Sequence, residues 1–153
     1  MTRFVLACLR VVMLCISFFF STLAAALFVT FSLFLGADVS WLEEDPLVAA
    51  GSLGFTLSVW LTIGWSLFLP FIGLVTIAEF TRLTGLLANL LMGGLCALIF
   101  LVLFISPENL DVPYSETEVW LTALAAGFVG GFTHWLIAGH RAGRWLGPQQ
   151  HIS

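Results

Sequence analysis

The sequence predicts an all-α integral membrane protein, with four transmembrane helices arranged as two antiparallel hairpins in a single domain over residues 1–153. Hydrophobic residues make up 60% of the chain and charged residues only 9%, whereas a soluble domain is about half apolar and a quarter charged. Four uncharged runs, 11–37, 47–78, 83–107 and 119–139, each reach the ~20 residues that a helix needs to cross a bilayer. None of them alternates polar and apolar residues, which favours helices over a β-barrel. The expected spans are about 11–36, 47–70, 84–106 and 119–139.

The basic and acidic residues lie in different loops, on opposite expected sides of the membrane. The five basic residues are all arginines, placed near the two ends of the chain or between the second and third spans: Arg3, Arg10, Arg82, Arg141 and Arg144. All the acids except Glu79 lie in the other two loops. Lys and Arg favour the cytoplasmic side of a membrane, so we expect both termini in the cytoplasm and the protein in a bacterial inner membrane. Four tryptophans lie where the aromatic belts are expected, at the outer boundary (Trp41, Trp120) and near the inner one (Trp135, Trp145).

The first span begins like a signal peptide, with arginines before an apolar run. The run continues through residues 27–36, well beyond the 7–15 residues of a signal-peptide core. We therefore expect a retained helix. Its small residues Ser17, Ser21, Ala25 and Ser32 form a narrow ridge that favours close approach of another helix.

The second span is unusually long, because residues 47–78 would extend about 48 Å as a straight helix. Pro70 removes a backbone hydrogen bond, so we expect a kink or break near it, with the following residues partly along the inner interface. Trp60 and Trp65 are expected to be packing residues. A second seam of small and polar residues follows this span: Gly51, Ser58, Thr62 and Ser66.

The third and fourth spans are dense in glycine, which allows helix backbones to approach closely. We expect helix packing, within the chain or with a second protomer, at Gly93, Gly127, Gly130 and Gly131. Before the fourth span, Ser115 and Glu118 have the spacing of a capping box.

One polar cluster is the candidate site. Asn89 and His134 lie at similar expected depth, about 10 Å inside the cytoplasmic boundary, and Glu79 and Arg82 are spaced to pair at its rim. One interpretation gives these groups a structural role, with a hydrogen bond between Asn89 and His134. The other gives them contact with an ion or proton.

No motif identifies a reaction. The cysteines Cys8, Cys15 and Cys96 form no C-x-x-C pair, and no nucleophile has a recognisable partner arrangement, so we expect no catalytic residues, cofactor or metal. The expected role is a non-catalytic accessory subunit in the lipid bilayer that associates with itself or another membrane protein, without nucleic acid. The alternative is a small oligomeric transporter or channel for an ion, proton or small solute. The expected spans contain no charged residue, which favours the first role.

Overall fold

The computed structural model describes residues 2–35, 46–104 and 115–142, and the predicted all-α fold class is confirmed there. The described elements are four α-helices and one short 3₁₀ turn: α1 (Thr2–Leu35), α2 (Pro46–Thr81), α3 (Leu86–Phe104), α4 (Glu116–Ile137) and η3 (Gly139–Arg141). Each α-helix is long and apolar enough to span a membrane. Most of the expected outer loops (36–45, with Trp41, and 105–114) and the tail with Arg144 and Trp145 lie outside the described residues.

The apolar stretches of the first two helices differ from the expected spans. They run over Val5–Ser32 and Leu53–Thr81, so they include Arg10 and Glu79. α2 also continues through Pro70 to Thr81, because a proline removes only one helical hydrogen bond and neighbouring turns can continue past it. The helix therefore does not end at Pro70, and a bend at this residue stays a prediction.

The helix ends follow local sequence signals. At the start of α4, Ser115 N donates to Glu118 Oε2 at 2.7 Å and Glu118 N donates to Ser115 Oγ at 3.4 Å, which confirms the predicted capping box. α2 begins at Pro46, whose fixed φ suits the first helical position. It ends before Arg82, whose φ of 55° turns the chain out of the helix.

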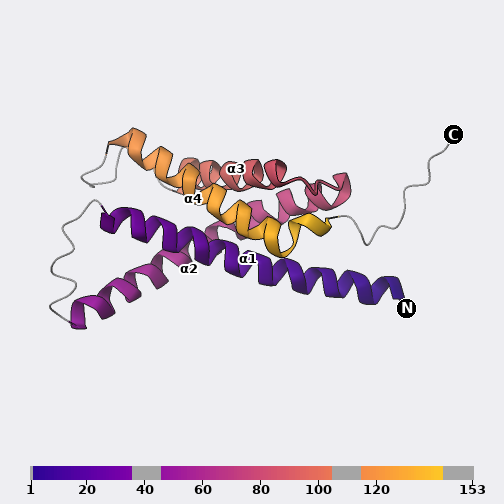
Figure 1. Ribbon diagram of the computed structural model, residues 1–153, viewed down its shortest axis with the longest axis horizontal. Helices are drawn as coiled ribbons and strands as arrows, with labels where there is room; N and C mark the ends of the chain where they lie inside the picture. Colours follow the sequence, from indigo (N-terminus) through magenta and orange to yellow (C-terminus); the bar gives the residue numbers. More distant parts are fainter. Residues whose placement is uncertain (1, 36–45, 105–114, 143–153) are drawn as a thin grey trace.

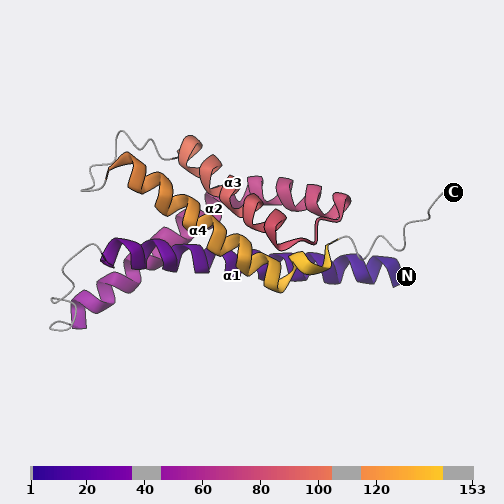
Figure 2. The same cartoon turned by 45° about the horizontal axis from the view of Figure 1, so that its top comes forward.

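The helices pack to very different extents. α4 lies between α1 and α3, and its contact with α3 is the most extensive in the described chain (Figure 1). α2 crosses α1 and makes the smallest of the main helix contacts with α3, as the turned view also shows (Figure 2). The start of α1, the α2–α3 turn and the end of α4 share one end of the bundle (Figure 1). Arg82 and Arg141 therefore lie at this end.

Candidate functional site

Glycines bring α3 and α4 into backbone contact. A Cβ added at Gly127 would lie 2.6 Å from the carbonyl oxygen of Gly93, and one added at Gly93 would lie 2.8 Å from the Cα of Gly131. A Cβ at Gly131 would collide with the carbonyl oxygen of Asn89. Three of the four expected packing glycines therefore lie at one contact, where no other residue fits without moving a backbone.

Gly130 lies on a different side of α4 and faces α1. A Cβ added there would lie 3.3 Å from the carbonyl oxygen of Ser21 and 3.7 Å from the Cβ of Ala25. The small-residue ridge of α1 thus meets α4. α4 therefore packs against α3 on one side and against α1 on another.

Asn89 and His134 do not form the expected hydrogen bond. The Asn89 amide Nδ2 donates to Gly85 O within its own helix at 2.9 Å, and its Oδ1 lies against the backbone of Gly139. His134 Nδ1 instead lies 2.6 Å from Ser17 Oγ of α1. The expectation was wrong because Asn89 Nδ2 bonds its own helix turn and the side chain fills the space beside Gly139, where Oδ1 is buried without a partner among the described residues, while His134 faces α1.

Glu79 is paired across the bundle with Arg10. Arg10 Nε donates to Glu79 Oε1 at 2.7 Å, Nη2 also contacts this oxygen, and Nη2 donates to Ala138 O at 2.9 Å. The two side chains are only 11% and 8% exposed. Arg10 therefore joins α1, α2 and the end of α4, while the expected pairing of Glu79 with Arg82 stays a prediction.

This ion pair corrects the view that the apolar spans contain no charge. Arg10 lies inside the apolar stretch of α1, and Glu79 lies inside that of α2. Sequence reasoning placed Arg10 before the first span, although Arg10, Ser17 and Ser21 share one helix face by their spacing of seven and eleven residues. That spacing was the available signal for a polar face on α1.

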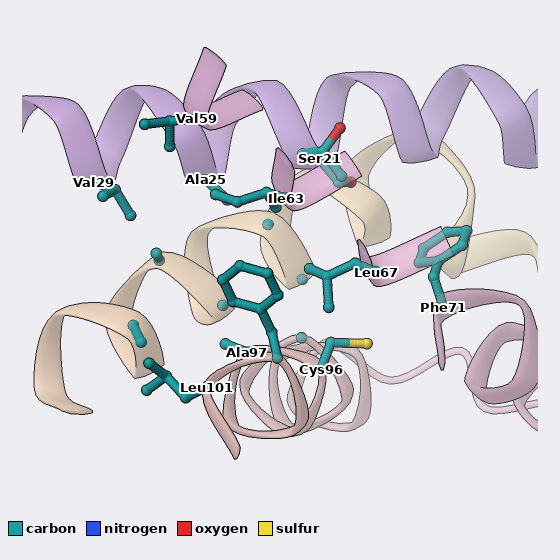
Figure 3. A pocket seen from close by; sticks show the side chains of 18 of the residues that line it. Ser21, Ala25, Val29, Val59, Ile63, Leu67, Phe71, Cys96, Ala97 and Leu101 are labelled. Atoms are coloured by element: carbon teal, nitrogen blue, oxygen red, sulfur yellow. The ribbon is translucent and has the colours of Figure 1, made fainter. Parts of the chain in front are cut away.

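The α2 seam of small and polar residues does not pack against a helix. Ser58 and Thr62 line a cavity between the four helices, and their hydroxyls donate to carbonyl oxygens one turn earlier at 2.9 Å. The cavity has a volume of about 530 Å³. Figure 3 shows some of the side chains that line it, and those that it labels come from α1, α2 and α3.

The two tryptophans of α2 have different surroundings. Trp60 Nε1 donates to Thr22 Oγ1 of α1 at 3.1 Å, so it packs as expected. Trp65 is 88% exposed, and its expected packing role within this chain was wrong. It lies at the edge of a shallow groove between α1 and α2 and is not covered by either helix.

The described residues offer no group of three or more His, Cys, Asp or Glu side chains that could hold a metal ion. Searches of protein-family models, curated proteins and solved structures found no match to the chain.

Proposed function

We propose that the protein is a non-catalytic accessory subunit of a membrane complex in a bacterial inner membrane. The observation that carries the proposal is the uncovered face of α2. An added Cβ at Gly51, Gly54, Gly64 or Gly73 would meet no atom within 4 Å. Glycine in a membrane helix commonly serves close helix contact, and the contact that α2 glycines would serve is not made within the described chain.

The polar groups support a structural role for the bundle itself. Glu79 is bonded to Arg10, and His134 to Ser17, so these groups hold helices together. The cavity wall is formed mainly by apolar side chains. Ion-selective pathways, in contrast, are commonly lined by backbone carbonyls or by charged side chains. This arrangement favours an accessory subunit over a conducting protein.

A small transporter or channel stays the second candidate, because Arg10, Glu79 and His134 lie in apolar helices. Ionisable residues at such positions commonly mark proton or ion pathways. Vesicles reconstituted with the purified protein and a trapped pH dye test this candidate. Proton flux that disappears in a folded His134→Gln variant would replace the accessory role with transport.

The accessory role is tested by purification from native membranes in a mild detergent. A second membrane protein should copurify at fixed stoichiometry, and a photo-crosslinking amino acid at position 65 should link to it. The same amino acid at position 121, in α4, is the control, since Leu121 is also exposed but lies on another helix. A protein that purifies alone, with no crosslink from position 65, contradicts the proposal.

The proposed orientation has both termini and Arg82 in the cytoplasm, and its support is the arginine distribution. An alkaline phosphatase fusion after Ser153 should be inactive, and one in the loop near Glu116 should be active. The reverse pattern would invert the topology.

A further inference from the structure

The cavity between the helices is long and apolar. Its lining extends along α4 from Glu118 to His134, roughly 24 Å at about 1.5 Å per residue. Its volume of about 530 Å³ lies within the range of ligand sites, roughly 300–1,000 Å³. The labelled side chains in Figure 3, such as Val29, Ile63 and Leu67, are almost all apolar. This shape and lining suit a hydrocarbon tail, and not an ion or a sugar.

The α2 wall leaves the cavity a route from the bilayer. α2 makes only a small contact with α3, and Ser58 and Thr62 are exposed although they line the cavity. A lipid tail can therefore enter between these helices without crossing water.

His134 supplies a polar group at one end of this cavity. Its side chain is 6% exposed and lines the cavity. Nδ1 is bonded to Ser17 Oγ, and the described residues provide no hydrogen-bond partner for Nε2. Nε2 is not among the fully buried side-chain atoms that lack a partner, so a ligand in the cavity can reach it and accept the hydrogen bond that the described residues do not take up.

The tautomer of His134 decides which ligand atom fits. The Ser17 hydroxyl has one proton and two acceptors within reach, Nδ1 at 2.6 Å and His134 O at 3.4 Å. We assign the hydroxyl proton to the shorter contact, although a ring whose Nδ1–H donates to Oγ would leave that proton for His134 O. Nδ1 of the neutral ring is then the acceptor and Nε2 carries the proton, so the matching ligand atom is an acceptor oxygen.

We propose that the cavity binds the tail of a long-chain membrane lipid, and that His134 Nε2 donates a hydrogen bond to a carbonyl oxygen of its head. His134 lies one turn before the end of α4, which places the head at the end of the bundle and the tail toward its middle. Ester-linked glycerolipids and isoprenoid quinones both have this chemistry. The inference does not rest on the accessory role, because a lipid in the cavity is compatible with any partner of α2.

The first experiment uses the native protein. After purification in mild detergent, native mass spectrometry should detect one bound lipid per chain, and organic extraction should identify it as a quinone or a glycerolipid. The delipidated protein should show a higher Tm after addition of either a short-tailed menaquinone or an ester-linked phosphatidylglycerol. The probe lipid that raises the Tm shows whether the cavity binds a quinone or a glycerolipid. A protein with no bound lipid and no Tm shift with either probe would overturn the proposal.

The tail site is tested by filling the cavity from α2. Thr62→Trp places an indole in the cavity, whereas Leu57→Trp places the same group on an exposed part of α2 outside it. Bound lipid should be lost in Thr62→Trp and retained in Leu57→Trp. Equal retention in the two variants, both folded by circular dichroism, contradicts a lipid in this cavity.

The role of His134 is tested from both sides of the bond. His134→Phe keeps a ring but removes the donor, and should weaken binding of the carbonyl lipid by about tenfold. If that variant does not fold, the native protein still answers the question through an ether-linked phosphatidylglycerol, which lacks the ester carbonyl. If the bound lipid is a glycerolipid, the ether lipid should bind less tightly than its ester counterpart. If it is a quinone, a short-tailed menaquinone that has been reduced and O-methylated to the dimethyl ether should bind less tightly than the quinone. Equal affinities of the matched pair would disprove the hydrogen bond.

Discussion

The α3–α4 contact and the α2 helix use the same residue types in opposite ways. Gly93 and Gly127 meet across two backbones, whereas a Cβ added at Gly54 of α2 would meet no atom within 4 Å. In the most apolar stretch of α2 only 11% of residues are buried, against 22% in each of the other helices. α2 is held at the bundle by the Arg10–Glu79 pair and aromatic contacts such as that of Phe71 with His134. Glycine content alone therefore does not identify a close helix contact.

Among the variants considered, removal of the Glu79 charge should destabilise the packing of α2 the most. Glu79→Gln leaves the buried Arg10 without its anionic partner, which typically costs about 3 to 5 kcal/mol. We expect α2 to detach while α3 and α4 stay packed. Thermal unfolding in detergent measures the loss, and cysteine crosslinks between helices show which contact opens.

The double variant Arg10→Gln with Glu79→Gln is the control for that experiment. Because no unpaired charge then stays buried, it should recover part of the lost stability. A double variant that is less stable than Glu79→Gln alone would mean that Arg10 has another essential role, such as its bond to Ala138 O.

The close contact itself is tested by Gly93→Leu. The new side chain would collide with the backbone of α4, and overpacking of this kind costs about 1 to 3 kcal/mol or more. Gly54→Leu, in open surroundings, should leave the Tm in detergent nearly unchanged. If Gly54→Leu destabilises the isolated protein as strongly as Gly93→Leu does, α2 is packed in a way that contradicts this comparison.

Gly130 should show an intermediate effect. Its nearest neighbour, Ser21 O, would lie 3.3 Å from an added Cβ, so α1 must shift to admit a Leu side chain. We expect Gly130→Leu to lower detergent-resistant stability less than Gly93→Leu does. Leu136→Ile, at a position 52% exposed, is the matched control and should behave like the native protein.

The smallest expected effect is that of Ser17→Ala. It removes the bond to His134, and interhelical hydrogen bonds in membranes average about 0.6 kcal/mol. The Tm should fall slightly, without detachment of α1, since Gly130 and Ala25 still pack. A loss as large as that of Glu79→Gln would show that the Ser17–His134 bond, and not the ion pair, is the main polar link.

The sequence by itself determined the all-α class, the number of helices able to span a membrane, and the start of α4. These properties are local, because they depend on apolar run length and on a capping box whose two residues are three positions apart. The sequence also indicated glycines at the α3–α4 contact. It misplaced Arg10, because a charge in an apolar run is normally a boundary unless a distant partner neutralises it.

Only the tertiary structure decided which residues meet. A helix that is apolar all round has no amphipathic stripe to show which face is covered, so the sequence could not separate the packed glycines of α3 and α4 from the open ones of α2. Arg10 and Glu79 are 69 positions apart, and Ser17 and His134 are 117 positions apart. Such pairs depend on how four helices cross, which no local spacing encodes. The cavity has the same origin, because its wall is assembled from residues of all four helices.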